Sequence, residues 1–292
     1  MEDNAIPRVI SKIIKSDTIP RQELETIHKK IAKIAQYKTV PDERKLFLID
    51  ELPAAKGLKQ PLDTARQNFI FERLGAYFEK YLNLSSTSRL LDIGGANGNL
   101  LAYLGTRYNI PKANLYCLEE TQYKTGTTAF RYPYDNENVT YVFSDTLSPK
   151  QSNDMGRFDI IIAMVVLHHI PDPIIIQSIA PFIEAHITPA GYLLIKEHDA
   201  KTAQLMNLID WEHHLYYLLE TPDKIPQHAL ANYLATFVGN YKPMTYFVDL
   251  FRRHRFVLKK TFNNVFEPVI QPFRNYAATK LYWQLFQYDG GS

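Results

Sequence analysis

The pattern of apolar and polar positions changes its period along the chain. Over residues 21–37, apolar side chains recur at spacings of three and four residues, which predicts an amphipathic helix. A second helix is expected over residues 63–81. From residue 90 onward, apolar runs of strand length are separated mostly by segments of helix length. These runs cover residues 90–93, 115–118, 139–143, 158–166 and 192–195, and residues 256–262 and 276–286 offer two more.

Strands that alternate with helices indicate an α/β fold. A parallel sheet covered by helices on both faces accounts for this alternation, because each crossover between parallel strands needs a connection of helix length. The helical first part of the chain shows no strand pattern. We therefore expect an N-terminal helical extension over residues 1–62 and one α/β domain over residues 63–289.

Composition and charge narrow the class of protein. The net charge of +2 over 292 residues neither demands nor excludes a nucleic-acid partner. The single cysteine, Cys117, excludes an intramolecular disulfide framework and a cysteine-based zinc cluster. The first residues carry charges throughout, and the longest apolar run, residues 160–167, is too short to span a bilayer. We expect a soluble, cytoplasmic protein without a membrane partner or a metal.

A glycine-rich turn is the strongest chemical signal. Residues 89–99 read RLLDIGGANGN, so an apolar strand ends near Asp92 and runs into clustered glycines before the next apolar positions. Glycine lets the backbone turn sharply and approach a ligand closely. Ligands bind open parallel sheets at the carboxyl ends of the strands, which is where this turn falls.

The turn resembles motif I of class I S-adenosylmethionine (SAM) dependent methyltransferases, D/E-x-G-x-G-x-G, with Ala96 in place of the middle glycine. The acid ending residues 115–119, the acid after residues 139–143, the string VLHHIPDP at 166–173 and the string TPAGYLLI at 188–195 resemble the later motifs in order. The resemblance implies a Rossmann-like, mostly parallel seven-stranded sheet of order 3-2-1-4-5-7-6. It also implies SAM as the cofactor, with Glu119 on the ribose hydroxyls and Asp145 on the adenine amino group. The implied cofactor-binding residues are Asp92, Gly94, Gly95, Asn97, Gly98, Glu119, Asp145 and Met164.

Ionisable and aromatic residues concentrate after the fifth strand. Lys196-Glu197-His198-Asp199 is followed by the segment 210–217, DWEHHLYY, where His213 and Tyr216 share one face of an expected helix. The candidate catalytic residues are Lys196, Glu197, His198, His213 and Tyr216. Glu197 and Asp199 could instead cap a helix, and we interpret the pair His168–His169 as structural. The block resembles methyltransferases of viruses, including cap-modifying enzymes.

Three hypotheses for the methyl acceptor are compatible with these residues. RNA, including a cap, is the leading one. Ribose 2′-O-methylation would match Lys196 but meets Met164 where an aspartate is expected, whereas guanine N7 needs no base. Trp211, Tyr216 and Tyr217 could stack on bases. A basic cluster that could instead be a solvated surface consists of Arg252, Arg253, Arg255, Lys259 and Lys260. The alternatives are a small-molecule O- or N-methyltransferase and a SAM-binding, non-catalytic subunit that serves a protein partner.

Overall fold

The computed structural model describes residues 75, 78–120, 136–202, 206, 209, 239–263 and 281–290. The chain divides into two compact units, and every helix and strand named below belongs to one of them. That unit combines the stretches Ala65–Asp199, Lys242–Glu267 and Leu281–Ser292. The predicted helix over residues 21–37, as well as His213 and Tyr216, lies outside the described residues. The predicted domain boundary at residue 62 also stays a prediction.

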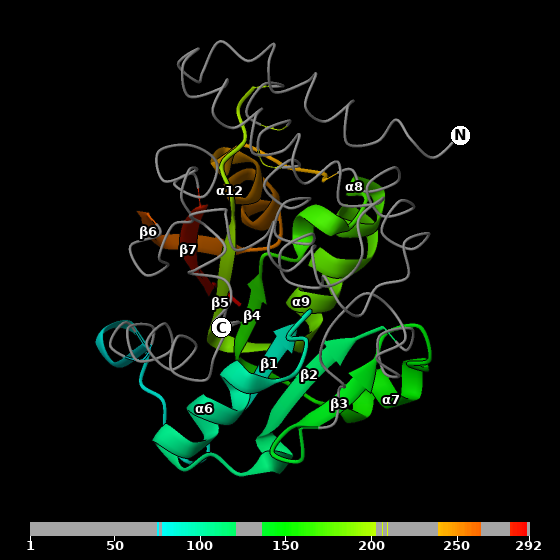
Figure 1. Cartoon of the computed structure of the whole chain (residues 1–292), viewed down its shortest axis with the longest axis vertical. Coiled ribbons are helices and arrows are strands. Elements are labelled where there is room, and N and C mark those ends of the chain that lie inside the picture. The colour runs from blue at the N-terminus through cyan, green and yellow to red at the C-terminus, as the bar shows by residue number, and fades with distance from the viewer. Residues whose placement is uncertain are drawn as a thin grey trace, which may run out of the picture. The chain divides into compact units, whose positions relative to one another are not determined.

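Seven strands form one sheet in the order β3-β2-β1-β4-β5-β7-β6, as predicted (Figure 1). Strand β7 runs antiparallel to both of its neighbours, and the remaining pairs are parallel. The strands are β1 (Leu90–Ile93), β2 (Leu115–Glu119), β3 (Thr140–Phe143), β4 (Phe158–Met164), β5 (Ile187–His198), β6 (Phe256–Asn263) and β7 (Leu281–Tyr288).

Helices connect most of these strands, as the spacing of the apolar runs predicts. They are α6 (Asn99–Tyr108), η2 (Lys112–Asn114), α7 (Pro149–Asp154), η4 (Leu167–His169), α8 (Asp172–Ile174), η5 (Ile175–Ile179), α9 (Ala180–His186) and α12 (Met244–Arg253). Helix α7 begins with a capping box, in which Ser148 and Gln151 satisfy each other's backbone N–H groups. Among the described residues, no helix is long and apolar enough to cross a membrane.

The sheet has an apolar core on each face. Leu90 and Ile160 pack on one face with the buried leucines of α6, and Leu91 and Ile161 pack on the other with α9 and α12. Alternate residues of a strand point to opposite faces. Because both faces are covered, the central strands read as continuous apolar runs rather than as an apolar–polar alternation.

Strand β5 differs from the prediction in its length. The string TPAG at residues 188–191, which precedes the apolar run predicted as the fifth strand, lies inside β5 as an irregularity. Phe158 pairs with Ile187, yet Ile160 pairs with Tyr192, so the extra residues bulge out of the ladder. Ala190 takes a left-handed conformation, with φ of 61°. The strand thereby keeps its pairing with β4 and reaches His198 at the carboxyl edge.

Candidate functional site

The glycine turn between β1 and α6 occupies the carboxyl edge of the sheet at the point where strand order reverses. Strand β1 lies between β2 and β4, whose crossovers leave in opposite directions. Gly94 and Gly98 have φ of 69° and 68°, and a β-carbon at either position would collide with Val166 or Val139. The turn is therefore closed to larger residues at both ends. Ala96 adopts φ of 50° in the place of the middle glycine.

Two buried carboxylates lie beneath this turn. Asp92 is 1% exposed, and its Oδ1 has no hydrogen-bond partner among the described residues. Glu119, the last residue of β2, accepts the N–H of Ala96 at 2.5 Å. Burial and the nearby Glu119 carboxylate raise the pKa of Asp92. Burial also raises the pKa of Glu119, although N–H donors, Ala96 among them, oppose the rise.

The residues present fit a bound SAM molecule. A β-carbon at Gly95 would lie 2.7 Å from Asp92 Oδ2 and 2.8 Å from Cys117 Sγ, so the turn has no room for a side chain there. SAM offers hydroxyl and amino donors as well as positive charge, which is the chemistry that an unpartnered buried carboxylate oxygen accepts.

The other implied cofactor residues follow the same edge. Asn97 is half-buried, and its carbonyl accepts the side-chain N–H of Asn136 at 3.1 Å. Asp145 is exposed, two residues beyond the end of β3. Met164 is half-buried at the end of β4. Because β1, β2, β3 and β4 are neighbours with parallel register, their carboxyl ends place these residues along one edge.

The candidate catalytic residues of β5 are buried. Lys196, Glu197 and His198 are 4%, 2% and 5% exposed. Lys196 Nζ lies 5.4 Å from the ring centre of Trp283, its partner on β7, in a cation–π arrangement. The ring of His198 meets that of His168 edge to face, with their centres 5.4 Å apart.

Glu197 and Asp199 bind the ends of helices. Glu197 Oε1 accepts the N–H groups of Val166 and Leu167, at the start of η4. Asp199 Oδ1 accepts the N–H of Met244, the first residue of α12. The capping interpretation of these two acids is thus confirmed. His168 is buried against Glu197, as its structural interpretation predicts. The contact of Val166 with Gly94 was not predicted, because no sequence signal marks it.

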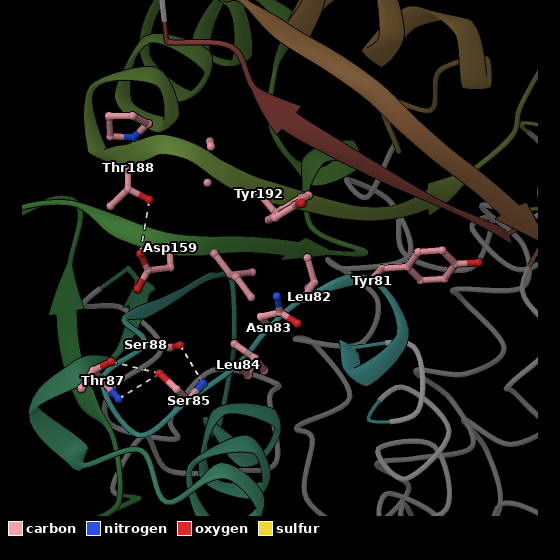
Figure 2. A pocket seen from close by; sticks show the side chains of 14 residues that line it. Tyr81, Leu82, Asn83, Leu84, Ser85, Thr87, Ser88, Asp159, Thr188 and Tyr192 are labelled. Carbon is pink, nitrogen blue, oxygen red and sulfur yellow. Dashed lines mark hydrogen bonds between the residues drawn. The ribbon is translucent and has the colours of Figure 1, made fainter. Parts of the chain in front are cut away.

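A cavity of about 360 Å³ opens at the opposite edge of the sheet (Figure 2). Its walls come from residues 81–88, from the start of β4 and from the bulge of β5. Figure 2 shows Thr188 directed at Asp159, whose Oδ1 accepts the hydroxyl at 3.3 Å, while Oδ2 accepts the N–H of Arg89 at 2.9 Å. Since it lies at the amino ends of the strands, this cavity is not part of the candidate cofactor site.

The arginines of the basic cluster also lie away from the glycine turn, whereas Lys259 and Lys260 lie within β6. Phe256, the first residue of β6, pairs with Tyr288 at the end of β7. That end of β7 lies beside the amino half of β5. The preceding arginines therefore sit at the amino edge of the sheet. Arg252 pairs with Asp249, and Arg255 pairs with Glu184. Among the described residues, no group of three His, Cys, Asp or Glu side chains could hold a metal ion.

Sheet order and glycine turn together define a class I SAM-dependent methyltransferase. Residues 63–237 match the family described as methyltransferase domain, and the chain belongs to this family. SAM is accordingly its methyl donor. No curated protein matches the chain significantly in sequence.

Solved structures show the same fold at low sequence identity. A SAM-dependent methyltransferase from Anabaena variabilis is 14% identical with a TM-score of 0.50, over 74% of this chain and 83% of that one. A Haloferax volcanii complex of the Trm112 methyltransferase activator with a methyltransferase gives 10% identity and a TM-score of 0.50, over 82% of this chain and 94% of that one. An O-methyltransferase family protein from Burkholderia thailandensis is 13% identical with a TM-score of 0.45, over 99% of this chain and 69% of that one.

Proposed function

We propose that this methyltransferase binds SAM at the glycine turn and methylates RNA in the cytoplasm. N7 of a guanine, including the guanine of an mRNA cap, is favoured over ribose 2′-O as the acceptor atom. SAM supplies a methyl group on a positively charged sulfonium, and the chain's own residues hold the cofactor and the acceptor in line for transfer.

The proposed cofactor site combines a turn without side chains and a set of acids. A β-carbon on Gly94, Gly95 or Gly98 would collide with neighbouring side chains, so these glycines allow the tight backbone shape that can approach the ligand closely. The carboxylate of Glu119 accepts the ribose hydroxyls, and that of Asp145 accepts the adenine amino group. The full proposed set is Asp92, Gly94, Gly95, Asn97, Gly98, Glu119, Asp145 and Met164.

The pairing of Met164 with Lys196 carries the preference for a nitrogen acceptor. These residues are partners in the β4–β5 ladder, at the position where a 2′-O-methyltransferase resembling this one would place an aspartate beside its lysine. Met164 has no carboxylate, and Lys196 packs over Trp283. An alcohol acceptor must lose a proton, whereas the lone pair of guanine N7 is available without a base. The observed pair therefore suits N7 better than a ribose hydroxyl.

The acceptor site is proposed to include His198 together with His213 and Tyr216, the last two outside the described residues. A role of this kind is positional, because transfer to N7 needs orientation and no proton acceptor. Lys196 and Glu197 belong to the same proposed region, at the carboxyl end of β5.

A small-molecule O- or N-methyltransferase is the second candidate. The arrangement of positive charge favours it: two arginines of the basic cluster are paired with acids, and residues 252–255 lie at the amino edge of the sheet. The arginines of that cluster therefore lie at the edge opposite the glycine turn, where the proposal places SAM. A SAM-binding subunit that needs a protein partner is a third possibility, since one solved structure of this fold is a complex with an activator.

The test is methyl transfer from radiolabelled SAM to capped RNA, uncapped RNA and a cell metabolite extract, each at two salt concentrations. Label in capped RNA that falls steeply with salt is the expected result, because RNA binding releases counterions. Label in the small-molecule fraction alone would overturn the RNA proposal. Bound SAM with no label anywhere would overturn it in favour of the partner-dependent subunit.

A further inference from the structure

The turn that follows β4 is held in a strained shape. Val165 has φ of 53°, a conformation that β-branched residues rarely adopt because of steric clashes. Such a residue keeps this shape only where its surroundings impose it.

Three successive N–H groups of this turn are held by the end of β5. The N–H of Val165 donates to the carbonyl of Lys196 at 2.7 Å. The N–H groups of Val166 and Leu167 donate to Glu197 Oε1 at 3.1 and 2.7 Å. A single carboxylate oxygen thus fixes two residues of the turn.

Glu197 is itself fixed in place. Its side chain is 2% exposed, and Oε2 lies 2.7 Å from Nδ1 of His168, whose side chain is 1% exposed. With Glu197 as a carboxylate, which only accepts hydrogen bonds, Nδ1 of His168 is the donor of this pair. With three donors around it, the carboxylate has a defined position and the turn after β4 is bound to the end of β5.

The same turn contacts the glycine turn. A β-carbon on Gly94 would lie 2.8 Å from Cβ of Val166, so the Val166 side chain packs directly against the Gly94 backbone. Gly94 is held from below by its N–H, which donates to the carbonyl of Leu118 at 2.9 Å. Contacts therefore run from Glu197 through Val166 to Gly94 without a gap.

We propose that Glu197 is a positioning residue for the cofactor: its carboxylate holds the strained turn at residues 165–167, which presses Val166 onto Gly94 and sets the shape of the glycine turn. The proposal rests on the assignment of that turn as the SAM site. In this role Glu197 acts on the cofactor site through the backbone, in addition to its place in the proposed acceptor region.

Glu197→Ala tests the proposal in calorimetric titrations with SAM. We expect the Kd for SAM to rise about ten-fold or more, the order expected when charge-assisted hydrogen bonds that hold a site are lost. Glu197→Gln retains one acceptor oxygen and should have a smaller effect. In the SAM-free protein, the amides of Val166 and Leu167 should exchange hydrogen faster in both variants, which reports on the turn independently of catalysis.

If Glu197→Ala does not fold, two further variants test the proposal. Val166→Ala removes the methyl groups that contact Gly94 and leaves Glu197 in place, so it should also weaken SAM binding. Val165→Gly removes the steric penalty, and Glu197→Gln should then weaken SAM binding less than it does beside Val165. An unchanged Kd in Val166→Ala, or an equal effect of Glu197→Gln in both backgrounds, would overturn the proposal.

Asp199→Ala is the matched control. It removes a neighbouring carboxylate of the same block that binds α12 and not the turn after β4. It should lower Tm without changing the Kd for SAM. An equal loss of SAM affinity in this variant would show that general destabilisation explains the result. Gly94→Arg distinguishes a failure of the cofactor site from a failure of the role of Glu197. If Gly94→Arg still binds SAM, the cofactor site itself is wrongly placed. If Gly94→Arg loses SAM while the other variants keep it, only the role of Glu197 is refuted.

Discussion

At the carboxyl edge of the sheet, two buried acids are expected to lower the stability of the SAM-free protein and to favour ligand binding. Asp92 is buried next to a second buried carboxylate, Glu119, and burial of ionised groups without partners is unfavourable. Such a pair is expected at a site that gains its missing partners from a ligand. Glu197 shows the opposite case, because the protein itself supplies all the partners described for its carboxylate.

Asp92→Asn should therefore stabilise the SAM-free protein while weakening SAM binding. The pKa of Asp92 is higher in the folded protein than in the unfolded chain. Above the folded pKa, the full free-energy cost of burying the charge is present. This cost is lost as the pH falls toward the unfolded pKa of about 3.9. Removing the charge should raise Tm by a few degrees, about 2–4 °C per kcal/mol gained, at pH 8 and less at pH 5. Thermal melts measure this.

Asp154→Asn is the control for that prediction, because Asp154 is exposed at the end of α7. Its Tm should stay close to that of the unmodified protein at both pH values. A lower Tm for Asp92→Asn at pH 8 would show that the Asp92 carboxylate stabilises the empty fold.

Elements at the other edge are joined by a charged cluster. Glu184 of α9 accepts hydrogen bonds from His254 and Arg255, which follow α12, at 2.7 and 2.8 Å. Arg255 has φ of 62° in the tight turn between α12 and β6, and its pair with Glu184 joins this turn to α9. Arg255, one of the basic residues near α12, thus connects the α12–β6 turn to α9.

Glu184→Gln should destabilise the protein in a pH-dependent way. Partial burial works to raise the pKa of Glu184, but the hydrogen bonds and charges of His254 and Arg255 outweigh it and lower the pKa. The stabilisation is therefore present above the unfolded pKa of about 4.3 and is lost as the pH falls through the folded value. We expect a loss of up to about 1 kcal/mol near pH 7, limited by solvent screening, in urea unfolding.

Arg252→Gln is the comparison at the scale of elements. Its pair with Asp249 is exposed and joins residues of the same helix. Its loss should change stability by no more than about 0.5 kcal/mol. If Glu184→Gln has no larger effect than Arg252→Gln at pH 7, the Glu184 cluster does not hold the α12–β6 turn.

At the scale of the whole molecule, SAM should stabilise the unit that carries the sheet. The glycine turn joins β1 to α6 and touches both β2 and the turn after β4, so a ligand there contacts segments distant in sequence. SAM at 100 times its Kd should add about 2.7 kcal/mol, which corresponds to a rise in Tm of about 5–10 °C.

Thermal melts with and without SAM check this rise, and Gly94→Arg is the control. This variant places a side chain where a β-carbon alone would collide with Val166. Because of this collision and the positive φ of Gly94, we expect the variant to have a lower Tm than the unmodified SAM-free protein and to show no shift when SAM is added. A shift of the same size in Gly94→Arg would exclude the glycine turn as the SAM site.

The amino-acid sequence by itself determined the alternation of strands and helices and the place of the glycine turn. Both are local properties: an apolar run reports burial, and clustered glycines report a backbone shape that other residues rarely adopt. The order of the sheet followed from the resemblance of five short motifs to a family, and the structure confirms it. The proposed cofactor residues come from the same resemblance, because they lie in or next to those motifs, and they stay a prediction.

Tertiary structure alone decided the roles of the charged residues. Glu197 lies 29 residues from His168 in the chain, and Glu184 lies 71 from Arg255. These meetings depend on strand register, such as the pairing of Met164 with Lys196, which no local pattern encodes. Val165 likewise adopts a left-handed conformation while its N–H donates to the carbonyl of Lys196, a residue distant in the chain at the end of β5. Local sequence encodes burial and turns, whereas packing across the sheet selects which polar groups meet.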